Sequence, residues 1–266
     1  MCFKAHNKGC ENLKRLATVT ALPVASPTGN GAAVGNIPAV VGKVTSVRYD
    51  VSKNIGAERI SARNTILKAV IFDFGNVICG FEYDLFLERL RRWSALPVET
   101  LREKIFGSGA HRRFERGDID TTAFHRFVES ATGAKIPEEA FAEAFIDIFT
   151  PLEEVCSIIR ELKGKTRLGL LSNTNELHFA RCIRPIPVFP LFDSITLSYE
   201  VGALKPEEAI YHDALKKLSF SSCECVFIDD IPAYVEGAKA IGMQGIRFET
   251  PEQLRADLAK LNVFSL

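Results

Sequence analysis

The sequence has no uninterrupted apolar stretch approaching the ~20 residues that a membrane-spanning helix needs. It also has no net charge, because 33 Lys and Arg residues balance 33 Asp and Glu residues. A protein that attracts nucleic acid or an anionic membrane through its overall field needs an excess of basic residues. We therefore expect neither a nucleic acid nor a membrane as partner.

Cysteine is present, but not in an arrangement that builds a metal site or a disulfide framework. The seven cysteines have no zinc-type spacing, and the pair Cys223 and Cys225 has no second pair to complete one. Their odd number also argues against a full set of disulfides. We therefore predict reduced thiols and a cytoplasmic protein.

The composition is otherwise ordinary for a globular enzyme, with 47% apolar and 25% charged residues. Residues 1–66 differ from the rest, since they hold nine Lys and Arg but three acids, which leaves 24 basic and 30 acidic residues for the remainder. They are rich in Gly, Pro, Ala and Val and carry several helix breakers. We predict a low-complexity, disordered N-terminal extension. A mis-assigned start, an organelle-targeting segment and a small ordered element stay open as alternatives.

From Lys68 onward, short continuous apolar runs alternate with amphipathic segments. Such runs are typical of strands buried on both faces, and they lie at 68–74, 166–173, 193–198, 225–230 and 244–248. Helical patterns lie at 151–164, 205–218, 231–242 and 250–261, the last with Thr250 as N-cap. Strands that alternate with helices predict βαβ units and hence an open, Rossmann-like α/β fold with a parallel sheet.

One stretch interrupts this alternation, because residues 83–150 read as helix after helix and contain no run that resembles a buried strand. An insert after the first strand would lie above the carboxyl edge of the sheet, where open α/β sheets bind ligands. We therefore predict three parts: the extension at 1–66, an α/β core formed by 67–82 and 151–266, and an α-helical cap at 83–150.

Polar side chains follow three of the predicted strands. Asp73 ends the first strand, residues 172–175 (Ser-Asn-Thr-Asn) end the second, and the pair Asp229 and Asp230 ends the fourth, while Lys205 opens a helix. Because the carboxyl ends of parallel strands share one edge, we expect these groups to converge. Two adjacent carboxylates repel each other unless a cation is near, and their oxygen ligands favour Mg²⁺. A carboxylate nucleophile beside a cation and a lysine is an apparatus for phosphoryl transfer.

The sequence motifs themselves resemble a known family. FDFGNV, LLSNTN, GALKPE and FIDD occur in this order along the chain. In order and spacing they resemble the four motifs of the haloacid dehalogenase (HAD) superfamily, and the helical insert lies where the type-I cap of that superfamily belongs. FDFGNVI, LSNTN, KPEEAIY and the cap segment FERGDI further resemble the bacterial glucose-1-phosphatase-like branch.

The resemblance implies a catalytic role for each matching residue. Asp73 would be the nucleophile that forms an aspartyl-phosphate intermediate. Ser172 and the backbone of Asn173 would bind the phosphoryl oxygens. Lys205 would balance the negative charge of the nucleophile and the phosphate.

The resemblance also implies a Mg²⁺ site in the same place. Asp73 and Asp230 would bind the ion directly, and Asp229 would do so through a water molecule. The backbone carbonyl of Gly75 would complete the protein ligands, because the family uses the carbonyl at this position and glycine still has one.

The cap offers one further candidate. Residues 111–115 read His-Arg-Arg-Phe-Glu, and we interpret them as a loop between two helices. Because such a loop could turn side chains toward the substrate, Arg113 is a candidate for substrate binding. A solvated basic loop is the alternative that the sequence leaves open.

Two positions depart from the family pattern. Most phosphatases of the superfamily carry a second Asp at the position of Gly75, where it protonates the leaving group and later activates water. Its absence removes a contribution of ~10²–10⁴-fold in rate, so we expect a preference for leaving groups that need little protonation, such as an anomeric sugar oxygen. Tyr234 stands where related DDxxxN sequences carry Asn, which changes one contact near the metal.

Three functions are compatible with these observations. The first is a Mg²⁺-dependent phosphatase of a small phosphorylated metabolite, with sugar phosphates among the candidates, working as a monomer or homodimer. The second is a non-catalytic HAD-like binding protein, which would explain the missing acid. The third is a 2-haloacid dehalogenase, an enzyme that also lacks the second Asp but has no use for two adjacent metal-binding carboxylates.

Overall fold

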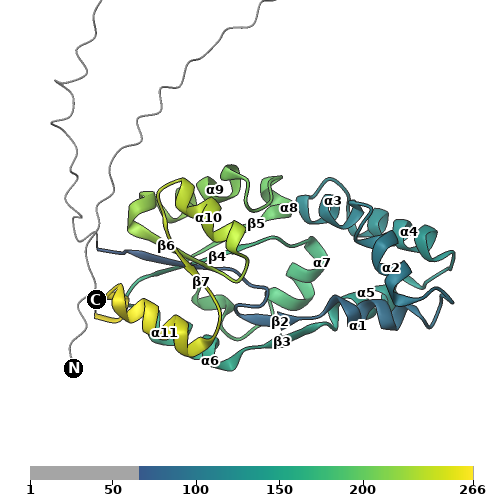
Figure 1. Ribbon diagram of the computed structural model, residues 1–266, viewed down its shortest axis with the longest axis horizontal. Coiled ribbons are helices and arrows are strands. Elements are labelled where there is room, and N and C mark those ends of the chain that lie inside the picture. The colour runs from purple at the N-terminus through teal and green to yellow at the C-terminus, as the bar shows by residue number, and fades with distance from the viewer. Residues whose placement is uncertain (1–65, 266) are drawn as a thin grey trace, which may run out of the picture. The chain divides into compact units, whose positions relative to one another are not determined.

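The computed structural model describes residues 66–265, and Figure 1 shows how the helices and strands of this part are arranged. The extension predicted at 1–66 therefore lies, apart from its last residue, outside the described residues. Within 66–265, no helix is long and apolar enough to cross a membrane.

A five-stranded parallel sheet forms the core, with the strand order β5-β4-β1-β6-β7. The first strand of the fold is therefore the central one. In the register of the sheet, Ala69 of β1 lies opposite Arg167 of β4 and Cys225 of β6. All five predicted strands are confirmed, with the bounds β1 (Ala69–Phe72), β4 (Arg167–Ser172), β5 (Ser194–Leu197), β6 (Cys225–Asp229) and β7 (Gln244–Arg247).

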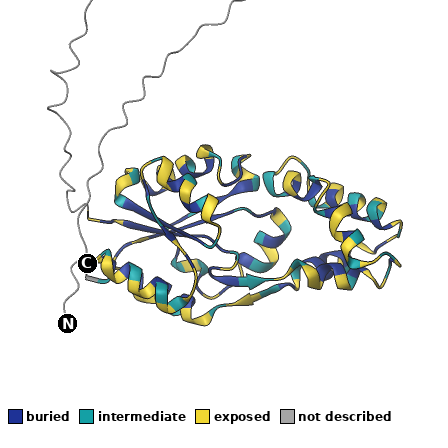
Figure 2. Cartoon of the chain, viewed as in Figure 1, coloured by how far each residue is buried: buried dark blue, intermediate teal, exposed yellow. Residues whose placement is uncertain are grey.

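Helices cover both faces of the sheet, as Figure 1 shows. Their bounds are α6 (Glu153–Leu162), α9 (Glu208–Leu218), α10 (Pro232–Ala240) and α11 (Pro251–Lys260). Side chains of α6 and α11 pack with Val70 and Phe72, whereas those of α9 and α10 pack with Ala69 and Ile71. Successive strand residues point to opposite faces, so both faces of β1 are buried (Figure 2). This burial is why its sequence is continuously apolar.

Local sequence determines where two of these helices begin. The Thr250 side chain accepts a hydrogen bond from the Gln253 backbone N–H at 3.1 Å, so Thr250 caps α11 as predicted. The helix predicted from residue 205 begins only at Glu208, and the Lys205 backbone N–H donates to the Asn173 side chain at 2.8 Å. The segment before α9 therefore belongs to the candidate site.

The insert folds as a group of helices with an aromatic core. The helices are α1 (Tyr83–Leu90), α2 (Val98–Ile105), α3 (Ala110–Arg116), α4 (Thr121–Thr132) and α5 (Glu138–Ile146). Their buried phenylalanines share one cluster, formed by Phe86, Phe114, Phe124, Phe141 and Phe145. The cap thus has its own hydrophobic core, separate from the two clusters that flank the sheet.

Two features of the cap differ from the sequence prediction. A short antiparallel ribbon, β2 (Cys79–Phe81) and β3 (Phe149–Pro151), connects the cap to the core, although only helices were expected from residue 83 onward. Residues 111–115, predicted as a loop, lie in helix α3. Gly109 and Gly117 bracket this helix in left-handed conformations, and one face of it is buried through His111 and Phe114. A helix of seven residues, about two turns, leaves too little periodicity to be seen in the sequence.

Short helical turns connect the larger elements. They are α7 (Glu176–His178), α8 (Ser198–Val201), the π-helical turn η2 (Phe179–Ile183) and the 3₁₀ turns η3 (Phe189–Leu191), η4 (Ser222–Glu224) and η5 (Val263–Ser265). Because α7 follows β4 and α8 follows β5, both turns lie at the carboxyl edge of the sheet, below the cap.

Candidate active site

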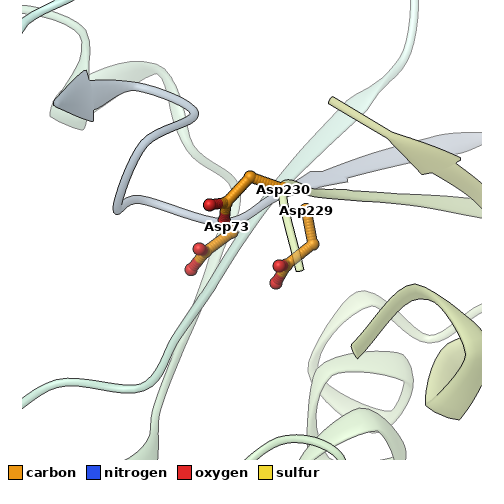
Figure 3. Close-up of side chains that lie close together, drawn as sticks. All are labelled: Asp73, Asp229 and Asp230. Atoms are coloured by element: carbon orange, nitrogen blue, oxygen red, sulfur yellow. The ribbon is translucent and has the colours of Figure 1, made fainter. Parts of the chain in front are cut away.

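The polar residues predicted to converge do so at the carboxyl edge of the sheet. Asp73 follows β1, Ser172 ends β4 and Asp229 ends β6, and these three strands are neighbours in the order β4-β1-β6. Figure 3 shows Asp73, Asp229 and Asp230 with their carboxylates gathered in one place. The parallel topology therefore assembles a cluster of acids from distant parts of the chain.

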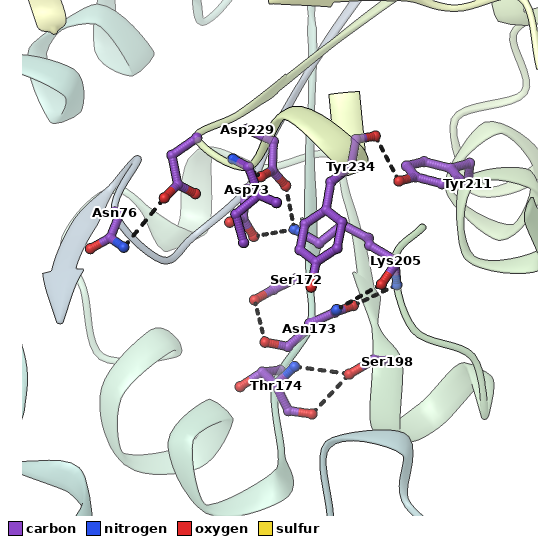
Figure 4. A network of polar contacts seen from close by, with 12 residues as sticks. Asp73, Asn76, Ser172, Asn173, Thr174, Ser198, Lys205, Tyr211, Asp229 and Tyr234 are labelled. Carbon is purple, nitrogen blue, oxygen red and sulfur yellow. Dashed lines mark hydrogen bonds and ion pairs between the residues drawn. The ribbon is translucent and has the colours of Figure 1, made fainter. Parts of the chain in front are cut away.

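Lys205 lies at the centre of this cluster. Its Nζ is 2.7 Å from Asp73 Oδ1 and 2.6 Å from Asp229 Oδ2, and the side chain is only 1% exposed (Figure 4). Burial alone would lower the pKa of the ammonium, but the two carboxylates together raise it above its ordinary value. Lys205 is therefore held charged, in contact with both acids.

The three carboxylates need more positive charge than this lysine supplies. One oxygen of each of Asp73, Asp229 and Asp230 lies within 4.8 Å of the others. Burial raises the pKa of Asp73 to about 7; Lys205 opposes this rise and Asp229 adds to it. Burial and the charge of Asp229 likewise raise the pKa of Asp230. An all-oxygen cluster with excess negative charge fits a divalent cation such as Mg²⁺.

The hydrogen bonds to Asp229 differ from those to the other two acids. It is fully buried, its Oδ2 accepts a hydrogen bond from Lys205, and its Oδ1 accepts one from the Ile231 backbone N–H at 2.8 Å. Both oxygens therefore already have a protein donor. This arrangement suits an indirect contact with a cation better than a direct one.

The residues after β4 fix the segment that carries Lys205. Asn173 Oδ1 accepts from the Lys205 backbone N–H at 2.8 Å, and Asn173 Nδ2 donates to the Lys205 carbonyl at 3.3 Å. Ser172 is 3% exposed, and within residues 66–265 its hydroxyl has a single, long contact of 3.4 Å, to the Asn173 carbonyl. Ser172 thus keeps a weakly committed hydroxyl beside Asp73 and Lys205, as Figure 4 shows.

The position of the missing acid is occupied by an aromatic ring. A Cβ atom added to Gly75 would lie 2.6 Å from Cε1 of Phe81. The Phe81 side chain, which comes from β2, therefore fills the space that a second Asp would use. Phe81 could not be identified from the sequence, because its contact with Gly75 depends on how the ribbon folds back.

Asn76 connects this ribbon to the acids, and it was not among the predicted residues. Its Nδ2 donates to Asp230 Oδ2 at 3.4 Å, and its Oδ1 accepts from the Phe81 backbone N–H at 3.3 Å. Its φ of 54° is left-handed, a conformation that Asn adopts more readily than most residues. An Asn directly after a glycine, in a turn after a buried strand, was the available signal.

Tyr234 covers the lysine from the side of α10. The centroid of its ring lies 5.0 Å from Lys205 Nζ, close enough for a cation–π contact. The Tyr211 hydroxyl donates to the Tyr234 carbonyl at 2.7 Å and so anchors the start of α10 (Figure 4). The aromatic ring at this position therefore stabilises the ammonium.

A cavity of about 450 Å³ opens above these groups and extends to the cap. Its lining combines core residues (Asp73, Gly75, Asn76, Asn173, Lys205, Asp230, Ile231 and Tyr234) with residues of the ribbon and cap (Phe81, Tyr83, Arg102, Phe106, His111 and Glu115). The predicted substrate contact Arg113 is not in this lining and is exposed on α3. Its helical neighbours His111 and Glu115 face the cavity, because α3 turns the face that they share inward.

Comparisons with known proteins agree with this geometry. The family described as haloacid dehalogenase-like hydrolase matches residues 67–242. The phosphatase MT3486 of Mycobacterium tuberculosis is 29% identical over 202 residues, which cover 71% of this chain and 90% of that protein. The D-ribitol-5-phosphate phosphatase of Bacteroides thetaiotaomicron is 23% identical over 200 residues, which cover 73% of this chain and 97% of that protein.

A solved structure shares the fold. It is that of the HAD family enzyme BT-2542 of Bacteroides thetaiotaomicron in complex with magnesium and inorganic phosphate. The two chains superpose with a TM-score of 0.61 at 22% identity, over 69% of this chain and 94% of the other. Since the family match covers more than half of the chain, with four of the five core strands, the cap and all four motifs, the chain belongs to the haloacid dehalogenase-like hydrolase family.

Proposed function

We propose that this protein is a Mg²⁺-dependent phosphatase that hydrolyses a small phosphorylated metabolite through an aspartyl-phosphate intermediate. The proposal rests on the position of Lys205. Its Nζ lies beneath a cavity, 2.7 Å from Asp73 Oδ1 and 2.6 Å from Asp229 Oδ2. A buried ammonium between a nucleophile and a metal acid suits the binding of a phosphate dianion. The names of two similar proteins, both phosphatases, support the same reaction.

The residues present allow the reaction to be written in two steps. In the first, an Asp73 carboxylate oxygen attacks phosphorus, the bond from phosphorus to the leaving-group oxygen breaks with its electron pair on that oxygen, and the oxygen takes a proton from solvent water. In the second, water attacks the phosphorus of the aspartyl-phosphate, and the bond from phosphorus to the Asp73 oxygen breaks with its electron pair on the carboxylate. One proton of the water stays on the released phosphate and the other passes to solvent. Lys205 stays charged throughout and stabilises the negative charge on the phosphoryl oxygens.

The remaining residues position the phosphoryl group. The Ser172 hydroxyl and the backbone N–H of Asn173 would donate to its oxygens. Asp73, Asp230 and the Gly75 carbonyl would hold Mg²⁺, with Asp229 acting through a water molecule. When bound, the ion would neutralise charge repulsion between the carboxylate nucleophile and the phosphate.

The substrate proposed here is a small phosphate monoester, with sugar phosphates as the first class to test. The cavity of about 450 Å³ is within the range of small-molecule sites. A monomer or a homodimer would suffice, because every proposed catalytic residue comes from one chain.

The test is a phosphate-release assay on a panel of phosphate monoesters with Mg²⁺, with EDTA and with the variant Asp73→Asn. We expect activity that requires Mg²⁺ and falls by at least about 10³-fold in Asp73→Asn, since the nucleophile is lost. Equal activity in the variant would remove the nucleophile assignment.

Two results would favour the other functions considered. Chloride release from 2-chloropropionate that EDTA leaves unchanged would indicate a dehalogenase. Tight binding of phosphate esters with no turnover of any of them would indicate a non-catalytic binding protein.

A further inference from the structure

Several polar side chains on the cap side of the cavity are not used by the proposed chemistry, and two of them lie on the same helix. His111 and Glu115 lie one turn apart on α3, and both line the cavity. Among the residues that the structure describes, His111 Nε2 is the one buried side-chain nitrogen or oxygen without a hydrogen-bond partner. His111 is only 8% exposed, so bulk solvent does not satisfy this atom. Such an orphaned group at a cavity wall indicates a partner that is not part of the protein.

Glu115 is also short of partners. Its side chain is 19% exposed, and His111 Nδ1, at 3.7 Å from Oε2, is the one basic group within ion-pair distance among the described residues. This separation is too long for a hydrogen bond. Burial raises the pKa of both Tyr83 and Tyr234, and the negative charge of Glu115 raises it further in each case. The carboxylate therefore lies near phenol groups from the cap wall and from the core wall.

The core holds this part of α3 in place. The Glu115 carbonyl accepts a hydrogen bond from Ser198 Oγ at 2.5 Å, and Arg116 donates to Glu207 of the core at 2.9 Å. A Cβ on Gly117 would collide with the Tyr199 carbonyl, so the end of the helix fits closely against α8. The positions of His111 and Glu115 relative to the nucleophile are thus fixed by packing.

The side chains on the cap side of the cavity restrict which chemical group of a ligand can bind there. A carboxylate repels a phosphate, so Glu115 suits the neutral leaving group and not the phosphoryl end. A carboxylate without a close donor is best satisfied by hydroxyl groups, and the unpartnered ring nitrogen can bind the same group. The rings of Phe81, Tyr83 and Phe106 line the same wall and offer flat apolar surfaces.

We propose that Glu115 and His111 form a hydroxyl-binding pair that selects phosphate esters of a ring-shaped polyol. This inference rests on the proposed phosphatase function and assigns the leaving-group subsite to the cap. In it, the Glu115 carboxylate accepts hydrogen bonds from ring hydroxyls, His111 Nε2 bonds to a neighbouring hydroxyl, and the aromatic rings pack against the C–H faces of the ring.

Three phosphate esters test the proposal. A hexose 1-phosphate and phenyl phosphate both have leaving groups that need little protonation, but only the first carries hydroxyls. Cyclohexyl phosphate has the ring shape without hydroxyls and with a poor leaving group. In Glu115→Gln we expect kcat/KM to fall by about 10- to 100-fold for the hexose 1-phosphate, the loss expected for hydrogen bonds to a charged group. For the other two esters we expect values within about twofold of the parent protein.

A second variant and a control complete the design. His111→Phe keeps the aromatic packing with Tyr83 and Phe106 but removes both ring nitrogens, and it should reproduce the selective loss. Glu103→Gln makes the same chemical change at an exposed position of α2 outside the cavity lining, and it should leave all three values unchanged.

The remaining outcomes would all contradict the inference, and each would indicate a different explanation. Equal losses for all three esters in Glu115→Gln would assign Glu115 a structural role. A loss largest for cyclohexyl phosphate, seen mainly in kcat, would make Glu115 a proton donor to the leaving group instead of a recognition residue. If the parent protein released phosphate from none of the esters, the proposed function itself would fail, whereas unselective activity would remove only the hydroxyl-binding pair.

Discussion

At Gly75, the ring of Phe81 occupies the space in which a side chain would have to fit. The glycine therefore cannot be exchanged for the missing acid without a second change. We expect Gly75→Asp alone to destabilise the protein by about 1–3 kcal/mol, the usual effect of overpacking, and to leave activity unimproved. Urea unfolding and the phosphate-release assay measure the two effects.

The double variant Gly75→Asp with Phe81→Ala should behave differently, because the new carboxyl group then has room beside the leaving group. We expect its kcat for cyclohexyl phosphate to exceed that of Phe81→Ala by about 10²-fold, the lower end of the range of general acid catalysis. No gain over Phe81→Ala would show that space is not what separates this site from those with a second Asp.

Lys205 is a further residue whose removal has a defined consequence. Lys205→Met leaves Asp73 and Asp229 buried without their ammonium partner, so we expect a loss of about 3–5 kcal/mol in the free energy of unfolding measured without Mg²⁺. The matched control is Lys217→Met, which removes a partly exposed ion pair with Asp213 and should cost less than about 1 kcal/mol. Similar losses in both variants would contradict the central position of Lys205.

At the scale of elements, His178 links α7 of the core to α5 of the cap. Its ring stacks on Phe145 at 4.1 Å, its Nε2 lies 3.1 Å from the Phe145 carbonyl, and its Nδ1 lies 3.2 Å from Asn175 Nδ2. A neutral ring with the proton on Nε2 satisfies both contacts. The pKa of His178 is lowered from 6.5 to about 3, mainly by burial and also by His111, while the hydrogen bond to the Phe145 carbonyl opposes the shift.

This shift predicts how stability depends on pH. Because the unfolded state binds the proton more readily, the stability that is fully present above pH 6.5 is lost as the pH falls toward 3. Between pH 6.5 and 5 the loss from His178 is about 2 kcal/mol. His178→Gln should flatten this part of the profile of urea midpoints, whereas His212→Gln, at an exposed position of α9, should not. If the urea midpoints of the parent protein, His178→Gln and His212→Gln changed in parallel with pH, the prediction would be contradicted.

Whether a helix or strand could be predicted from the sequence depends on which interactions stabilise it. The strand β1 could be predicted because burial on both faces requires a continuous apolar run. Helix α3 could not, because the two glycines and the partners that bury His111 and Phe114 are evident only in the folded cap. The ribbon of β2 and β3 was missed for a similar reason, since its short strands are held by pairing across the whole insert.

At the scale of the whole molecule, cation binding should stabilise the fold. The acids that form the candidate metal site come from both β1 and β6, so an ion bound there favours the folded state. At Mg²⁺ concentrations about 100 times the dissociation constant, the gain is ~2.7 kcal/mol, or about 5–10 °C in melting temperature. Asp230→Asn should reduce this shift strongly, and Asp118→Asn, at an exposed position of the cap, should retain it. An unchanged shift in Asp230→Asn would place the ion elsewhere.

The cluster of acids around Lys205 was predictable from topology, whereas the cap wall of the cavity was not. Asp73 and Asp229 had to meet once their strands were parallel neighbours. Of these two cap arginines, Arg102 lines the cavity and Arg113 does not, and this difference depends on helix orientation, which the residue types do not reveal. The cytoplasmic location and the nature of residues 1–66 stay predictions.

The central position of β1 also affects how the molecule is made. Both neighbours of this strand, β4 and β6, are synthesised much later, and Asn76 contacts Asp230 across 154 positions of the chain. Contacts at such separations form slowly in folding. On the ribosome, the sheet has no complete centre until β6 has emerged, although the cap helices are finished long before. The candidate active site therefore cannot form before β6 has been made, and a truncated chain that lacks β6 would lack Asp229 and Asp230.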